Sequence, residues 1–258
     1  MASSKTRLSE TACPSGRVLE RPCPRGRDIQ RFRDSLMSWG GGNLRLFPWR
    51  KNRPSNYKIV VSEILLQRTR AVVVAGFYQP YFRAYPSWNA LANAQRPCLE
   101  SDLKPIGLFK RRAVTLIDLA QVMVLRNGRF PADRADIEEL PGVGQYVANA
   151  IELFVHGRPR PLLDVNTARL LERYFGPRKL ADIRNDPYLQ TLAQLVVADA
   201  PDPASLNWAM LDYAALVCRS GKPACDTCEL SKRCRHALGK ESPRSSAPTP
   251  RRKRDQLP

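Results

Sequence analysis

Four cysteines near the carboxyl end of the sequence have the spacing of a metal site. Cys218, Cys225, Cys228 and Cys234 stand within 17 residues, in the order C-x6-C-x2-C-x5-C. Four thiolates in one short loop can hold a tetrahedral zinc ion or an iron–sulfur cluster, and the spacing alone does not choose between them. The opening stretch, MASSKTRLSETACPSGR, has no apolar signal-peptide core, so we expect metal binding rather than a disulfide framework.

A second pattern, ELPGVGQYVANAIELF at residues 139–154, joins a short helix to a longer one through a tight turn. The turn contains Gly142, Val143 and Gly144, and its two glycines let the backbone amides come close to another chain. Those amides, with the positive end of the following helix, can bind a phosphate without reading base sequence. Taken alone, the turn is equally consistent with a plain corner between two helices.

Two carboxylates stand in positions that could support acid–base chemistry. Asp164 lies where LLDVNTARLLERYFG passes from an apolar run into a helical pattern, and an aspartate there most often caps the helix. Glu63 lies in the apolar stretch VSEILLQRTRAVVV. A carboxylate in such surroundings is either exposed on the far face of the helix or placed for function.

The elements that must position these residues are helices. Apolar residues recur at helical spacing over 28–40, 55–70, 112–126, 145–157, 167–176 and 188–200, and no run alternates as a strand does. The sequence therefore predicts an all-α fold of two helical lobes. Residues 1–27 and 237–258 are rich in basic and small polar residues and are predicted to be a flexible arm and a disordered tail.

The charge balance points to a polyanionic partner. Lys and Arg total 42 against 24 Asp and Glu, which gives a net charge of +18 and a pI of about 10.1. Such an excess is typical of proteins that bind nucleic acid or an anionic membrane surface. No apolar run approaches the roughly 20 residues of a membrane span, so we expect a cytoplasmic, nucleoid-associated protein of prokaryotic type.

The order of these motifs resembles that of the helix-hairpin-helix DNA glycosylases of the endonuclease III type. The resemblance rests on LPGVGQYVANAI, LLDVNTARLLERYFG and the cysteine loop, and covers residues 28–236. It implies two lobes with a DNA-binding cleft between them: a six-helix barrel lobe over about 58–162 and a cluster lobe formed by 28–57 and 163–236. It also implies a [4Fe–4S] cluster on the four cysteines, and a monomer that binds double-stranded DNA containing a mismatch.

The resemblance gives Asp164 a catalytic role that is compatible with helix capping. Breaking a glycosidic bond builds positive charge on the sugar, which a carboxylate can stabilise while it orients the attacking water. In adenine-removing relatives an asparagine at the position of Asn166 assists at the sugar. Where lyase members carry a lysine that forms a Schiff base, this sequence has Tyr146, whose phenol cannot do so. We therefore expect a monofunctional enzyme with little or no AP-lyase activity.

The resemblance also implies which residues handle the base and the DNA backbone. Glu63 would reach the flipped base, protonating a ring nitrogen of adenine, or accepting from the ring N–H of thymine or uracil or activating water. Gln67 would fill the gap left in the duplex, and Arg68 would contact the partner base or the backbone. The stretch PIGLFKRRAV would offer further cations to phosphates: Lys110, Arg111 and Arg112.

The preferred base is predicted to be thymine, and more easily uracil, opposite guanine. The relatives of that specificity carry a tyrosine at position 146, and the sequence ends 24 residues after Cys234 without the extra domain usual in adenine glycosylases. Gln67 departs from the arginine expected in the thymine group. Two alternatives stay open: removal of adenine opposite guanine or 8-oxoguanine, and a non-catalytic iron–sulfur protein that binds DNA.

Overall fold

A computed structural model describes residues 23–51 and 54–239. Within those ranges every regular element is helical, with eleven α-helices, four short 3-10 helices and no strand. The predicted all-α class is therefore confirmed. Most of the predicted basic arm and tail lies outside the described residues.

One lobe is built from consecutive helices around a single apolar core. They are α2 (Asn56–Leu66), α3 (Ala71–Ala84), α4 (Trp88–Ala92), α5 (Arg96–Leu103), α6 (Phe109–Leu125), α7 (Arg134–Glu138) and α8 (Gln145–Phe154), with the 3-10 helices η1 (Pro48–Arg50) and η2 (Lys104–Ile106). Val61 of α2, Leu116 of α6 and Ile151 of α8 lie buried in this core. The first turn of α8 and the last turn of α2 thus belong to one packed unit.

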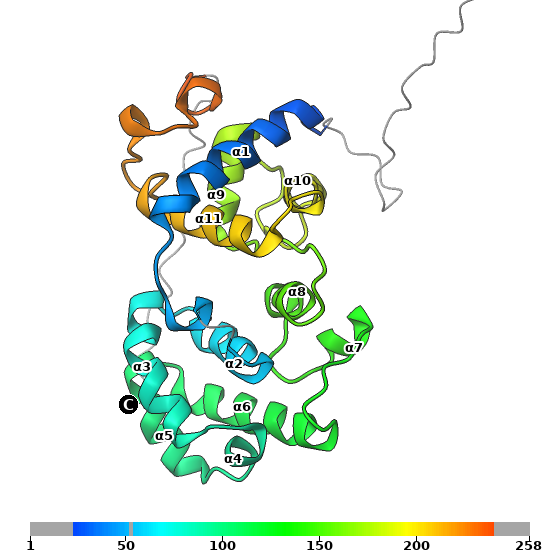
Figure 1. Cartoon of the computed structure of the whole chain (residues 1–258). Coiled ribbons are helices and arrows are strands. Elements are labelled where there is room, and N and C mark those ends of the chain that lie inside the picture. Colours follow the sequence, from blue (N-terminus) through cyan, green and yellow to red (C-terminus); the bar gives the residue numbers. More distant parts are fainter. Residues whose placement is uncertain (1–22, 52–53, 240–258) are drawn as a thin grey trace, which may run out of the picture.

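The other lobe joins the two ends of the described chain. It contains α1 (Gly26–Asn43), α9 (Val165–Phe175), α10 (Pro187–Ala198) and α11 (Pro203–Leu216), followed by η3 (Cys225–Thr227) and η4 (Ser231–Arg233). Phe32 of α1 packs against Tyr174 of α9 with ring centroids 4.8 Å apart, and both rings lie in the second core. Figure 1 shows these four helices at one end of the molecule, α2 to α6 at the other, and α8 between them.

The predicted boundary between the lobes at residues 57 and 58 differs from the packing. Leu44 contacts the core of the second lobe, whereas Phe47 and Trp49 are buried in the core of the first. Their rings are stacked, with centroids 4.7 Å apart. The chain therefore crosses between lobes just after α1, because the aromatic pair packs on α2 and α3 rather than on α1. Trp49 is a core residue.

Aspartate and serine caps set where several helices begin. The Ser55 side chain accepts from the Lys58 amide at the start of α2, and Asp202 accepts from the Ser205 amide at the start of α11. Such caps satisfy backbone N–H groups that the first helical turn leaves unpaired. Among the described helices, none has the length and apolar character needed to cross a membrane.

Candidate active site and DNA-binding surface

Glu63 is a buried carboxylate on the inner side of α2. Its side chain sits between apolar neighbours and is only 5% exposed. Burial raises the pKa of Glu63 to about 7, although the charge of Arg50 and the hydroxyl of Tyr146 both act to lower it. Within the described residues, Oε2 of Glu63 has no hydrogen-bond partner. The carboxyl group can therefore change protonation near neutral pH and has a free oxygen for a ligand.

Tyr146, in the first turn of α8, interacts with both carboxylates predicted to act. Its hydroxyl is within hydrogen-bonding reach of Glu63, and its ring also experiences the charge of Asp164. Burial raises the pKa of Tyr146 well above its usual value, and both carboxylates add to the shift. The phenol consequently stays neutral at physiological pH. The structure thus brings together Glu63, Tyr146 and Asp164, which come from three different helices or their caps.

Asp164 is the N-cap of α9, as the sequence pattern indicated. One of its oxygens, Oδ1, accepts from the amides of Asn166 and Thr167 at 2.9 and 2.8 Å. The other, Oδ2, accepts from the side-chain amide of Asn166 at 2.8 Å. These bonds hold the carboxylate in one orientation at a helix N-terminus, so capping and a fixed catalytic position are compatible.

Asn166 links Asp164 to the cysteine loop through a residue that the sequence analysis did not single out. The Asn166 side-chain oxygen accepts from Arg169 at 3.0 Å. Arg169 in turn donates to the carbonyl of Cys218 at 3.0 Å and to that of Ala214 at 2.8 Å. The orientation of the Asp164 carboxylate is therefore connected, bond by bond, to the backbone of the first cysteine.

Arg50 is a second residue that the sequence analysis missed. It is nearly buried and pairs with the fully buried Asp212 of α11 at 2.7 Å. It also sets a positive charge near Glu63 and Tyr146. Its Nε atom has no hydrogen-bond partner among the described residues. Arg50 follows Trp49 directly, but Asp212 is 162 positions away in the chain, so the pair could not be read from local sequence.

The hairpin turn between α7 and α8 has the close packing that its glycines indicated. Gly142 has a φ of 75°, and a β-carbon there would overlap the Thr115 side chain of α6. Gly144 is exposed and a β-carbon there would meet nothing within 4 Å. The Val143 side chain is buried in the core and its amide donates to the Leu140 carbonyl at 3.0 Å. Val143 therefore shapes the turn, and Gly144 offers the accessible backbone at the start of α8.

The two glycines should respond differently to substitution by alanine. Gly142→Ala is expected to destabilise the protein by about 1–3 kcal/mol, since a left-handed backbone and an overlap with the stiff Thr115 side chain both oppose a β-carbon. Gly144→Ala is expected to leave the melting temperature unchanged and to weaken DNA binding. Thermal unfolding and duplex binding of the two variants, measured side by side, check this, and equal melting temperatures would contradict it.

Comparison with known proteins places this arrangement in a family. A model of the HhH-GPD superfamily of base excision DNA repair proteins matches residues 61–185. The thymine-DNA glycosylase of Aeropyrum pernix is 36% identical, over 80% of this chain and 94% of that protein. The chain belongs to the HhH-GPD superfamily. It is a DNA glycosylase of base excision repair.

Other members of the superfamily agree with this placement. The thymine/uracil-DNA glycosylase of Pyrobaculum aerophilum is also 36% identical, over 79% of this chain and 90% of that protein. The adenine DNA glycosylase of Arabidopsis thaliana is 29% identical, and the match covers 81% of this chain but 37% of that longer protein. A solved structure of a thermostable thymine-DNA glycosylase superposes with a TM-score of 0.77 and 31% identity, over 83% of this chain and 98% of that one.

Among the described residues of this HhH-GPD protein, three exposed non-glycine residues have a backbone that few residues adopt, and Asn127 is one of them. Arg68 and Leu108 have φ values of 58° and 52°, in the left-handed region where side chains are strained. Gln67 precedes Arg68 at the end of α2, is exposed, and donates from Nε2 to the Gly142 carbonyl at 3.3 Å. The end of α2 and the hairpin therefore form one continuous surface. Leu108, 53% exposed, was not singled out from sequence.

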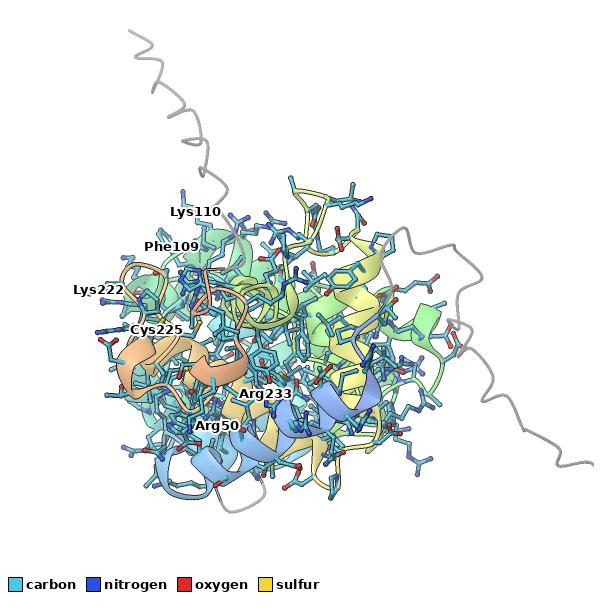
Figure 2. The ribbon with its side chains drawn as sticks, turned by 90° about the horizontal axis from the view of Figure 1, so that it is seen from above. Arg50, Phe109, Lys110, Lys222, Cys225 and Arg233 are labelled. Carbon is cyan, nitrogen blue, oxygen red and sulfur yellow. The ribbon has the colours of Figure 1, made fainter. Side chains whose placement is uncertain are left out.

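One of the three cations expected to contact phosphate turns inward. Arg112 is buried, and its guanidinium donates to the carbonyls of Gln67 and Gly107, both at 2.7 Å. It therefore ties the loop after α2 to the loop before α6 and is unavailable to DNA. Lys110 and Arg111 are exposed at the start of α6, as expected. Figure 2 shows the Lys110 side chain at the outer edge of the molecule in that view.

The four predicted metal ligands line one small cavity beside the end of α11. Cys218, Cys225, Cys228 and Cys234 all contribute to its wall. The Tyr213 hydroxyl lies 3.1 Å from the Cys228 sulfur, and Arg173 lies 3.5 Å from that of Cys218. Within the described residues, no group of three or more acidic, His or Cys side chains is arranged to hold a single metal ion. Four thiol groups around one cavity are the donor set of a zinc ion or of an iron–sulfur cluster.

Proposed function

We propose that the protein is a monofunctional DNA glycosylase that removes thymine, and more readily uracil, mispaired with guanine and leaves an abasic site. The observation that carries this proposal is that Tyr146, a phenol, interacts with both Glu63 and Asp164. A neutral phenol at that point supplies no amine for attack on the sugar, so bond breaking must rely on the carboxylates and water. The thymine glycosylase relatives cited above support the choice of base.

The three side chains divide the reaction between base and sugar. As the bond from C1′ to the base breaks, its electron pair leaves with the base and positive charge develops on the sugar. Asp164, oriented by three hydrogen bonds at the start of α9, stabilises that charge and directs water to C1′. Glu63 has an unpaired oxygen with which to accept from the ring N–H of the flipped pyrimidine, while Tyr146 packs beside it.

We propose that the four cysteines hold a [4Fe–4S] cluster, because four thiolates around one cavity are the ligand set of a cubane and their spacing is the one that the family resemblance associates with such a cluster. The cluster would stabilise the loop between Cys218 and Cys234. The hydrogen bonds from Cys218 through Arg169 and Asn166 would then help to hold the Asp164 carboxylate in place. Purified protein is expected to contain about four irons per chain, with the visible absorbance of a cluster. Cys225→Ser should lose the iron, and a zinc-loaded, colourless protein would contradict the proposal.

The partner is double-stranded DNA that contains a mismatch, bound by a monomer. The exposed backbone at Gly144, the side chains of Gln67 and Arg68, and the cations Lys110 and Arg111 supply the contacts to the duplex. Leu108 adds an apolar side chain able to press between bases beside the opened pair. Because the substrate is genomic DNA, we place the protein in the cytoplasm with the nucleoid.

A panel of duplexes, each with a single mispair, tests the proposed base. We expect release of uracil and thymine opposite guanine, because opening a mismatched pair costs less than opening a matched one. We also expect uracil to be released faster than thymine. Release of adenine opposite guanine or 8-oxoguanine without release of thymine would show that the protein is an adenine glycosylase. Binding without release from any duplex would favour the non-catalytic alternative.

Replacing Tyr146 by lysine should add strand cleavage. An amine placed beside Glu63 and Asp164 can attack C1′ and form a Schiff base, which borohydride reduction traps as a covalent complex with DNA. We expect trapping with Tyr146→Lys and none with the wild type. Tyr146→Phe is the control, since it keeps the ring without adding an amine. Trapping of the wild-type protein would contradict the monofunctional assignment.

A further inference from the structure

The segment that leads into Asp164 has no regular secondary structure and connects the two lobes. Residues 158–163, with the sequence RPRPLL, connect α8 to α9 and form neither helix nor strand. Pro159 and Pro161 have no N–H group to donate. The carbonyl groups of such a segment, where buried, need hydrogen bonds from elsewhere. The position of Asp164 thus depends on what holds this segment.

Side-chain amides from three helices hold it. Asn149 of α8 donates to the Pro161 carbonyl at 2.8 Å. Asn207 of α11 accepts from the Leu162 amide at 2.6 Å and also donates to the Arg160 carbonyl at 3.0 Å. Gln194 of α10 donates to the Pro159 carbonyl at 2.9 Å. Asn149 and Asn207 are buried, and their contacts fall two to four residues before Asp164.

A buried carboxylate fixes the Asn149 side of this arrangement. Glu152, one turn after Asn149 on α8, is fully buried and pairs with Arg134, Arg158 and Arg160 at 2.6, 3.2 and 3.0 Å. Arg134 also donates to the Asn149 side-chain oxygen at 2.6 Å. That bond fixes which end of the amide faces the segment, so that the Asn149 nitrogen points to Pro161.

We propose that Asn149 and Asn207 are positioning residues that set the reach of the Asp164 carboxylate toward the sugar. Asn149 lies three residues after Tyr146, so both project from the same side of α8. Helix α8 therefore carries two side chains with separate roles. The Tyr146 ring lies beside the base, and the Asn149 amide fixes the Asp164 carboxylate beside the sugar. Asn207 secures the same segment from the opposite lobe. This inference rests on the proposed catalytic role of Asp164.

We call the hydrogen bonds from Asn149 and Asn207 to residues 160–162 the clamp. The loss of rate expected when a clamp bond is removed follows from geometry. A catalytic group displaced by about 1 Å can lose on the order of 100-fold in rate without any change in its chemistry. The DNA contacts described above come from the hairpin, the end of α2 and the start of α6, none of which Asn149 or Asn207 bonds directly. A loosened clamp should therefore slow base release and leave duplex binding intact.

Amide-to-acid substitutions test the clamp with little change in shape. Asn149→Asp keeps an oxygen for Arg134 but cannot, when ionised, donate to Pro161. Gln194→Glu is the matched control, because it removes a bond of the same kind at Pro159, five residues before Asp164. Asn149→Ser and Asn207→Ser serve as uncharged variants should a buried acid prevent folding. Each full-length variant is assayed for single-turnover release, duplex affinity and melting temperature.

We expect Asn149→Asp, and likewise Asn149→Ser and Asn207→Ser, to slow single-turnover release by about 10- to 100-fold. The dissociation constant for a duplex with a non-cleavable 2′-fluoro sugar should stay within about twofold. Gln194→Glu should slow release far less than the Asn149 and Asn207 variants do. If all variants slow release in proportion to their loss of stability, or if the loss lies in duplex affinity, the clamp is only structural. The assay uses whichever mispair the wild type releases, so an error in the proposed base would not hide the outcome.

Discussion

Asp164→Asn is expected to slow base release by about 10³-fold while the protein remains folded. Asparagine caps helices about as well as aspartate does, and its side-chain oxygen can still accept from the Asn166 and Thr167 amides. What the substitution removes is the negative charge that stabilises the developing positive charge on the sugar. Single-turnover release from a G·T or G·U duplex measures the loss of rate, and thermal unfolding shows whether the variant is as stable as the wild type.

Asp202→Asn is the matched control for this experiment. Asp202 caps α11 through the Ser205 amide at 3.0 Å, and its substitution removes the same charge from a similar helix start away from the site. It should change neither release nor stability appreciably. Normal release by Asp164→Asn would show that the residue is only a cap, and the catalytic role would have to be abandoned.

Glu63→Gln is expected to lose activity and gain stability at alkaline pH. The glutamine cannot carry the negative charge with which Glu63 accepts a hydrogen bond from the ring N–H of the base. Removing a group of this acid–base type typically slows the reaction by about 10²–10⁴-fold. The gain in stability has a separate cause. Burial raises the folded-state pKa of Glu63 to about 7 from an ordinary value of 4.5, so the folded protein disfavours the charged form.

The pH range of this effect follows from those two pKa values. Below pH 4.5 the glutamate is neutral whether the chain is folded or unfolded, so its ionisation does not change the free energy of unfolding. As pH rises toward 7 the unfolded chain ionises first, and stability falls; above pH 7 the loss is complete at up to about 3 kcal/mol. Glu63→Gln should therefore unfold at higher denaturant than the wild type at pH 8, with the difference shrinking toward pH 4.5. A constant difference over this range would contradict the raised pKa.

Local pattern predicted the helices that have one apolar face, and among them are α1, α6 and α10 as well as the helices at the site. The predicted helices at 145–157 and 167–176 correspond to α8 and α9, because each has one apolar face and a polar boundary at its start. α3 was not predicted: AVVVAGFYQPYFRA is apolar on most sides and contains Pro80, so it shows no helical face. Packing between α2 and its neighbours, not local preference, makes that stretch helical.

The same distinction applies to the site. Glu63 and Asp164 were singled out because a carboxylate in an apolar run and one at a helix start are visible in sequence, and their expected catalytic roles came from the family resemblance. Arg50 and Asn207 could not be singled out, because their importance comes from partners far along the chain, Asp212 in one case and the segment before Asp164 in the other. Arg112 was misassigned for a related reason: a cluster of cations does not reveal which member turns inward.

The pairing of the two ends of the described chain in one lobe affects how the enzyme is made. The helices from α2 to α8 are contiguous, so their lobe can form as soon as it leaves the ribosome. The other lobe forms only when α1 packs against α11. A β-carbon on Gly40 of α1 would lie 3.2 Å from the Ala209 side chain of α11. The ion pair between Arg50 and Asp212 also requires α11 to be in place. Contacts so far apart in sequence form late. During synthesis the nascent chain therefore carries an unassembled active site, and the capacity to excise bases arises only as the last helix docks.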